Sequence, residues 1–185
     1  MSAAGGPAVP ASDPATLVAL LNATSFGMHL PPESQLRLAR LARRYQAPAG
    51  TVLLVEGSVA NELCVVVSGR VALCTPVPDH GMTTILTVEP GDVFGVSALI
   101  RPYRVTESCV AVQPVDIIAL DGPGLRAALA ADPQMAAILY GRILEAMTRR
   151  LVATRLQLLD LYSLSPGRLP SLPSPEALSP AGDRI

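Results

Sequence analysis

The amino-acid sequence predicts a mainly β domain, an antiparallel sandwich or barrel, flanked by N-terminal helices and one long C-terminal helix. Short β-branched runs separated by Gly and Pro turns fill residues 46–120. Apolar residues at helical spacing precede this region in residues 15–45 and follow it in residues 121–162. The Pro-rich ends, residues 1–14 and 163–185, show no apolar period. We expect them to be disordered tails, which leaves one domain at residues 15–162.

The N-terminal part of this domain is predicted to be helical up to residue 45. Ala15–Leu21 is a short apolar segment, and Pro31 and Pro32 precede a second helix over Glu33–Arg44. In that second helix leucines recur at helical spacing, while four arginines are placed to project outward.

Six strands are predicted in the middle of the chain. Several are apolar at consecutive positions, as in residues 64–67, which is typical of central strands or strands covered by helices. The predicted strands are Thr51–Val55, Leu63–Val67, Arg70–Val77, Met82–Val88, Thr106–Val112 and Val115–Leu120.

The C-terminal helix is predicted over residues 133–162. Asp121 is a candidate cap for a shorter helix before it, and Asp132-Pro133 places an N-cap residue before a proline at the first helical position.

One apolar stripe of the long helix has heptad spacing, and a second stripe (Leu139, Ile143 and Ala146) faces elsewhere. Two stripes imply two partners. We expect the second to pack on the helix's own β domain and the first to form a homodimer; the alternative is that both pack within one monomer. The heptad seam consists of Ala137, Tyr140, Leu144, Met147, Leu151, Thr154, Leu158 and Leu161.

Composition excludes several classes of protein. The net charge of −1 gives no bulk attraction to nucleic acid or anionic membranes. All 14 basic residues are Arg, which excludes lysine Schiff-base chemistry and a Walker-type phosphate loop. No apolar run approaches the roughly 18 residues of a membrane span, and the N-terminus lacks the features of a secretory signal. We expect a cytoplasmic protein without membrane contact.

Catalytic and metal-binding motifs are not apparent. His29 and His80 fall in predicted loops, and no Ser-His-Asp order, HExxH motif or carboxylate pair stands out. With a turn at Ser68-Gly69, Cys64 and Cys74 are expected nearly opposite each other on paired strands. We interpret the three cysteines as buried small apolar residues rather than as ligands or a disulfide. The sequence thus predicts neither an enzyme, a metal site nor a cofactor.

Three segments carry a resemblance to a known family. They are Pro48–Gly57, Leu63–Val71 and Pro90–Gly95, with glycines 50, 57, 69, 91 and 95 in the same order and spacing as in the cyclic nucleotide-binding domain. Residues 24–162 resemble this domain of catabolite-activator/FNR-type regulators. The resemblance implies a jelly roll (double-stranded β-helix) with a dimerisation helix and a phosphate-binding cassette to which Pro90–Gly95 is the entry.

The cassette departs from the family pattern. Where the resemblance implies a Glu that accepts hydrogen bonds from the ribose 2′-OH, this chain has Val96. Losing such a buried partner costs about 1–3 kcal/mol, or about tenfold to a hundredfold in affinity. The family's phosphate-binding Arg corresponds to Arg104 if the loop is one residue shorter, and to Val105 if it is not. The expected ligand-binding residues are Phe94, Gly95, Val96, Ser97, Ala98, Arg104, Val105 and Thr106.

Details of this segment extend the expectation. Gly95, Ser97 and Ala98 are expected to begin a short helix with N–H groups available to an anion. On an extended strand, Arg104, Thr106 and Ser108 would share one face, while Val105, Glu107 and Cys109 would share the other.

Three functions remain open at this point. The domain is a regulatory sensor for a small anionic or nucleotide-like ligand with altered selectivity, a dimeric interaction module with a vestigial pocket, or a cyclic AMP sensor. Residues 163–185 show no recognition helix and no basic stripe, so we do not expect direct DNA binding. We expect instead that the domain acts through an unidentified protein partner.

Overall fold

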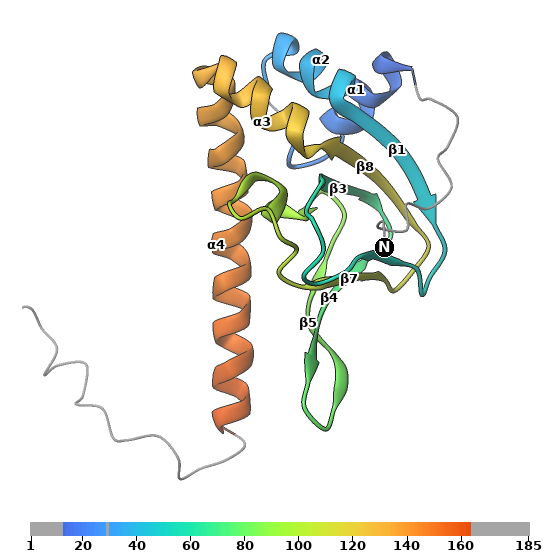
Figure 1. Cartoon of the computed structure of the whole chain (residues 1–185), viewed down its shortest axis with the longest axis vertical. Helices are drawn as coiled ribbons and strands as arrows, with labels where there is room; N and C mark the ends of the chain where they lie inside the picture. Colours follow the sequence, from blue (N-terminus) through green and yellow to red (C-terminus); the bar gives the residue numbers. More distant parts are fainter. Residues whose placement is uncertain (1–12, 29, 164–185) are drawn as a thin grey trace, which may run out of the picture. The chain divides into compact units, whose positions relative to one another are not determined.

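The computed structural model describes residues 13–28 and 30–163, with side chains to residue 159. The two predicted tails lie almost entirely outside the described residues. The chain divides into two compact units. The first ends at Arg150 and contains both sheets, and the second begins at Leu151 within helix α4. The first part contains helices packed on two antiparallel sheets, so the predicted fold class is confirmed (Figure 1).

Among the described residues, four α-helices flank the sheets. Before the strands come α1 (Pro14–Asn22) and α2 (Pro32–Leu41), and after them come α3 (Gly122–Ala131) and α4 (Pro133–Ser163). The predicted caps are present. The carboxylate of Asp121 accepts the Gly124 N–H at 2.7 Å, and that of Asp132 accepts the Met135 N–H at 3.0 Å.

In the part of the chain that the structure describes, eight strands form two sheets of four. One sheet has the order β1-β8-β3-β6 and the other β2-β7-β4-β5, and all pairings are antiparallel. The first sheet consists of β1 (Ala42–Ala47), β8 (Val115–Asp121), β3 (Glu62–Ser68) and β6 (Val93–Phe94). The second consists of β2 (Val52–Leu54), β7 (Ser108–Ala111), β4 (Val71–Val77) and β5 (Gly81–Val88).

The predicted helix over residues 33–44 is wrong at its end. Helix α2 stops at Leu41, and residues 42–47 form β1 against β8. In strand geometry the Tyr45 side chain enters the core, and the Arg44 guanidinium reaches the buried Asp116 carboxylate, with Nε 2.9 Å from Oδ1. The pairing with β8 and this ion pair outweigh the local helical period.

The expected pairing of Cys64 with Cys74 is also wrong. At Gly69 the chain crosses from one sheet to the other, so β3 and β4 belong to different sheets and are not paired. Cys64 lies opposite Phe94 and Ala119, whereas Cys74 lies opposite Thr84 and Ser108. Cys64, Cys74 and Cys109 are all buried free thiols, as the sequence predicts.

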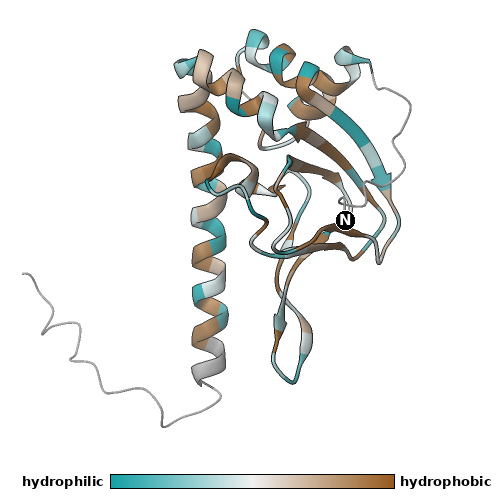
Figure 2. Cartoon of the chain, viewed as in Figure 1, coloured by the Kyte–Doolittle hydropathy of each residue, from teal (hydrophilic) through white to brown (hydrophobic). Residues whose placement is uncertain are grey.

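Two apolar cores share one wall. The first lies between the sheets, and the second lies between the β1-β8-β3-β6 sheet and the helices. Along β8, Ile117 and Ala119 enter the first core, while Ile118 and Leu120 enter the second. Strand β3 alternates in the same way, which explains why these strands are apolar on both faces. In Figure 2, β8 is mostly hydrophobic and β1 is more hydrophilic.

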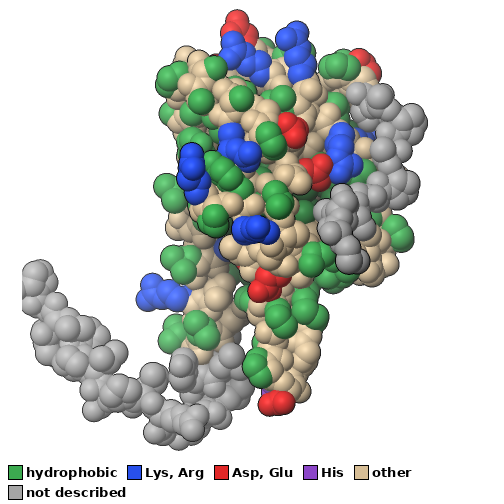
Figure 3. Space-filling model, viewed as in Figure 1, with side chains coloured by type: hydrophobic (Ala, Val, Ile, Leu, Met, Phe, Trp, Pro, Cys, Tyr) green, Lys and Arg blue, Asp and Glu red, His purple; other side chains and the backbone are tan. Residues whose placement is uncertain are grey.

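The surface carries both signs of charge. Figure 3 shows arginines and acidic side chains interspersed on the face in view. Within residues 13–28 and 30–163, no helix is long and apolar enough to cross a bilayer.

Candidate functional site

The cassette begins where β6 ends. Phe94 is buried in the core between the sheets, and Gly95 turns the chain with φ = +73° into the four-residue 3₁₀ helix η1 (Val96–Leu99). A Cβ at Gly95 would lie 2.6 Å from the carbonyl oxygen of Glu62, so the turn packs against β3 at a distance that only glycine permits. The short helix expected at this point is present, but the Ala98 N–H donates to the Gly95 carbonyl oxygen at 3.0 Å and is therefore not available to an anion as expected.

A cavity of about 260 Å³ lies beside η1. Five of the expected binding residues line it: Gly95, Val96, Ser97, Arg104 and Thr106. The other lining residues are Ile100, Arg101, Pro102, Glu107, Met147 and Arg150.

The remaining expected binding residues are not on the cavity wall. Phe94, Ala98 and Val105 are buried and belong to the core between the sheets. Their side chains stabilise the turn from inside, whereas the cavity is built from their neighbours in sequence.

Arg104, rather than Val105, faces the cavity. The Arg104 side chain is exposed, and its Nη1 donates to the carbonyl oxygen of Gly57 at 3.0 Å. The backbone of Arg104 forms an isolated antiparallel bridge with Val59. The side-chain bond therefore fixes one nitrogen of the guanidinium beside the turn that contains Gly57.

The expected alternation of residues 104–108 is wrong. Arg104, Thr106 and Glu107 all line the cavity, because regular strand geometry begins only at Ser108. The Thr106 hydroxyl lies 3.2 Å from the Ser97 hydroxyl and 3.2 Å from a carboxylate oxygen of Glu107. Ser108 is instead buried, and its hydroxyl accepts the Glu56 N–H at 3.1 Å. The cavity thus contains a carboxylate that strand periodicity places on the other face.

Arg150 is a cavity residue that sequence reasoning missed. It comes from α4, and its Nη2 donates to the carbonyl oxygen of Val93. Burial lowers the pKa of Arg150, an effect opposed by the carboxylates of Asp92 and Glu107. A signal was available, because Arg150 continues the spacing of the buried stripe Leu139, Ile143 and Ala146.

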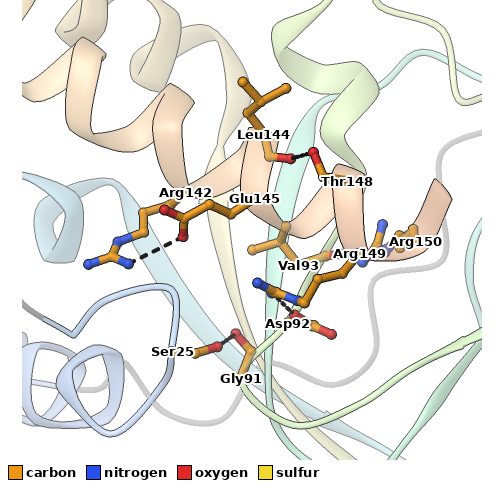
Figure 4. Close-up of polar contacts among 10 residues, drawn as sticks. All are labelled: Ser25, Gly91, Asp92, Val93, Arg142, Leu144, Glu145, Thr148, Arg149 and Arg150. Carbon is orange, nitrogen blue, oxygen red and sulfur yellow. Dashed lines mark hydrogen bonds and ion pairs between the residues drawn. The ribbon is translucent and has the colours of Figure 1, made fainter. Parts of the chain in front are cut away.

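Further polar contacts join α4 to the turn before the cassette. Arg149 pairs with Asp92 at 2.8 Å, whereas Arg142 pairs within α4 with Glu145 at 3.3 Å (Figure 4). The Ser25 hydroxyl donates to the Gly91 carbonyl oxygen at 2.8 Å. Two consecutive arginines of α4, Arg149 and Arg150, therefore contact the consecutive residues Asp92 and Val93, which Phe94 separates from Gly95.

The two stripes of α4 differ in burial. Leu139, Ile143 and Ala146 are buried in the core under the helices, as expected. Of the seam, Ala137, Tyr140, Leu144, Leu151 and Leu158 are exposed, Thr154 is half-buried, and Met147 is half-buried on the cavity wall. The side chain of Leu161 lies outside the described residues. Homodimerisation through the seam remains a prediction.

Comparison with known proteins identifies the domain. Residues 44–132 match the family model of the cyclic nucleotide-binding domain. The chain is 28% identical over 136 residues to a CRP-like cAMP-activated global transcriptional regulator of Mycobacterium tuberculosis, a match that covers 71% of this chain and 59% of that protein.

Two solved structures are similar. A cyclic nucleotide-binding domain from Methylobacillus flagellatus has a TM-score of 0.68 and 24% identity, covers 86% of each chain, and shows the common fold. A cAMP-binding acyltransferase from Mycobacterium smegmatis has a TM-score of 0.56 and 29% identity, and the match covers 68% of this chain and 39% of that one. This chain therefore contains, at residues 44–132, a domain of the cyclic nucleotide-binding family.

Proposed function

We propose that this domain is a non-catalytic sensor that binds a small anionic or nucleotide-like ligand in the cavity beside η1. The observation that carries the proposal is the composition of the cavity wall. Three arginines, Arg101, Arg104 and Arg150, line it together with the hydroxyls of Ser97 and Thr106. Guanidinium groups and hydroxyls are the side chains that bind phosphate and carboxylate oxygens.

The cavity suits a metabolite rather than a macromolecule. Its volume of about 260 Å³ lies just below the usual range for small-molecule sites, which is about 300–1,000 Å³. The lining also contains apolar side chains, those of Val96, Ile100, Pro102 and Met147. A lining that combines apolar side chains with a few polar groups is usual in sites that bind a ring attached to an anion.

We propose altered selectivity because of Val96. This side chain lines the cavity, and its alkyl group cannot accept a hydrogen bond from a ribose hydroxyl. The cavity does hold one carboxylate, Glu107, but it comes from the strand β7 side of the wall and already accepts from Thr106. Cyclic AMP is the first compound to test, since the names of the relatives specify it.

The proposed output is protein contact through α4. The exposed seam favours a homodimer, with a further protein as downstream partner. The net charge of −1 provides no bulk attraction that would favour DNA as the partner.

The experiment is a thermal-shift series on the purified full chain with cyclic AMP, cyclic GMP, inorganic phosphate and uncharged adenosine. A specific ligand stabilises the native state by RT ln(1 + [L]/Kd), about 2.7 kcal/mol at a hundredfold excess over Kd. We expect at least one anion to raise the Tm and adenosine alone to do so less.

The other readings are outcomes of the same series. No shift with any of the compounds, together with a stable dimer, would favour a vestigial cavity in an interaction module. A second outcome is that cyclic AMP binds tightly and raises the Tm while cyclic GMP and inorganic phosphate do not. The domain would then be a cyclic AMP sensor, and altered selectivity would be refuted.

A further inference from the structure

Arg150 has an open hydrogen-bond donor inside the cavity wall. Its Nε is buried and, within the part of the chain that the structure describes, it makes no hydrogen bond. The same guanidinium donates through Nη2 to the Val93 carbonyl oxygen, which is neutral. A half-buried cation in this state carries a desolvation cost, and no carboxylate of the described residues lies in hydrogen-bond contact to offset it.

The acidic groups near Arg150 have other partners. Asp92 pairs with Arg149 at 2.8 Å, and Glu107 lies within hydrogen-bond distance of the Thr106 hydroxyl at 3.2 Å. Among the ion pairs of the described residues, none includes Arg150. Burial lowers the pKa of Arg150, which indicates the same imbalance between desolvation and pairing.

Arg104 is in the opposite situation. Its side chain is exposed, and water solvates the guanidinium where it is not bonded to Gly57. A charge in a less polar environment attracts an anion more strongly than one in water, and a ligand that pairs with Arg150 also satisfies its open donor. Of the two arginines, Arg150 therefore gains more from an anion in the cavity.

We propose that Arg150 is the principal anion-binding side chain of this cavity and that it holds the phosphate group of the ligand. The inference rests on the proposed function and specifies which residue performs it. Arg104, to which the family resemblance assigns the phosphate, is then a secondary contact. A planar guanidinium with an open Nε and a terminal nitrogen matches the spacing of two phosphate oxygens.

The position of Arg150 gives the contact a structural consequence. Arg150 belongs to α4 and directly precedes the seam residue Leu151, whereas Arg104 lies in the loop before β7. A phosphate held by Arg150 therefore contacts the helix that carries the proposed dimer seam. A ligand bound to Arg150 would also compete with the Val93 carbonyl oxygen for the same guanidinium, beside β6 at the entry to the cassette.

The test compares three matched variants of the full chain: Arg150→Met, Arg104→Met and Arg149→Met. Each is measured by thermal denaturation alone and with cyclic AMP, inorganic phosphate and adenosine as probes. We expect Arg150→Met to weaken binding of both anions by at least about tenfold, and Arg104→Met to weaken it less. Arg149→Met, which removes an ion pair outside the cavity, keeps the wild-type shifts.

The ligand-free Tm distinguishes anion binding from a structural role. Since Arg150→Met removes a buried open donor, we expect the Tm without ligand to be unchanged or raised. A marked fall in that Tm with unchanged anion shifts would show that Arg150 only supports Val93 and would overturn the proposal. If Arg150→Met does not fold, Arg150→Gln removes the charge but keeps a polar side chain; wild-type anion affinity in Arg150→Gln would also overturn the proposal.

The two levels of inference fail differently. If wild-type protein shows no shift with either anion, the proposed function fails, and this inference with it. If wild-type protein binds but Arg104→Met abolishes binding while Arg150→Met retains it, the cavity is the site and only the assignment to Arg150 is wrong.

Discussion

At the scale of single residues, Gly95 fixes where the cassette turns. It has φ = +73°, and a Cβ would meet the Glu62 carbonyl oxygen at 2.6 Å and the Leu54 side chain at 3.1 Å. Gly57 has a similar φ of +77°, but a Cβ there meets nothing within 4 Å. A comparison of the two glycines therefore distinguishes two costs of adding a side chain. Gly57 reports only the strain of the left-handed backbone, whereas Gly95 reports that strain together with steric crowding.

We predict that Gly95→Ala destabilises the domain more than Gly57→Ala does. Gly57→Ala is expected to cost about 1 kcal/mol, since only the left-handed conformation is strained. Gly95→Ala adds a contact with backbone atoms of β3 that cannot rotate away, for a total of about 2–4 kcal/mol. Urea denaturation of both variants measures the difference, and equal free energies of unfolding would contradict the prediction.

Individual residues also show where sequence reasoning about the site ends. Local motifs were enough to predict five residues of the cavity lining: Gly95, Val96, Ser97, Arg104 and Thr106. Glu107 could not be placed, because the alternation of a strand does not hold before Ser108. Arg150 is more than 40 positions from the cassette in the sequence. The helical period predicts on which face of α4 this side chain lies, but it does not predict which loop that face contacts.

At the scale of elements, the boundary between α2 and β1 is decided by distant partners. Leucines at helical spacing predict α2 correctly, and arginines continue without any local break up to Arg44. The strand is selected by Asp116 and Glu62, which bind Arg44 and Arg43 from β8 and β3. The ion pairs span up to 72 positions, so no local window of sequence contains them.

Helix α4 was predicted closely because two apolar stripes, each at helical spacing, lie on different faces of it. The buried stripe packs under the helical layer, whereas the seam exposes Leu144 by 67% and Leu151 by 66%. Apolar side chains this exposed along one face are typical of an association surface.

We predict that the protein is a homodimer and that Leu151→Asp makes it monomeric, because a carboxylate in a heptad seam would be desolvated without a partner. Light scattering measures the mass. Leu156→Asp is the matched control: Leu156 is 58% exposed on the same helix, away from the seam, and its replacement is expected to leave the dimer intact. A wild-type monomer, or loss of the dimer in both variants, would refute the seam.

At the scale of the whole molecule, fold class followed from the turn and strand pattern, but sheet membership did not. Strand periodicity states which residues share a face, and it leaves open which strands are neighbours. The crossing at Gly69 is an example, because this turn looks like a hairpin in sequence. In the structure a Cβ at Gly69 would lie 2.2 Å from the carbonyl oxygen of Pro114, which belongs to the connection from β7 to β8 and thus also lies between the two sheets.

The three buried cysteines give a measurement on the folded molecule as a whole. Burial raises the pKa of Cys109 to about 12 and that of Cys64 well above its ordinary value. At pH 8 both therefore stay protonated and unreactive in the native state, and unfolding returns them toward an ordinary pKa of about 8.5. We predict slow reaction of native protein with a thiol-specific disulfide reagent and rapid reaction of three thiols after denaturation; fast labelling without denaturant would contradict the buried assignment.

The wall shared by the two cores has a consequence for cooperativity. Strands β3 and β8 place alternate side chains in each core, so neither core retains its packing when the other opens. The helical layer and the strand layer should therefore melt together in a single two-state transition, although they are separate layers. Helical circular dichroism reports the core under the helices, and Cys64 and Cys109 report the core between the sheets, so the two signals are expected to share one midpoint.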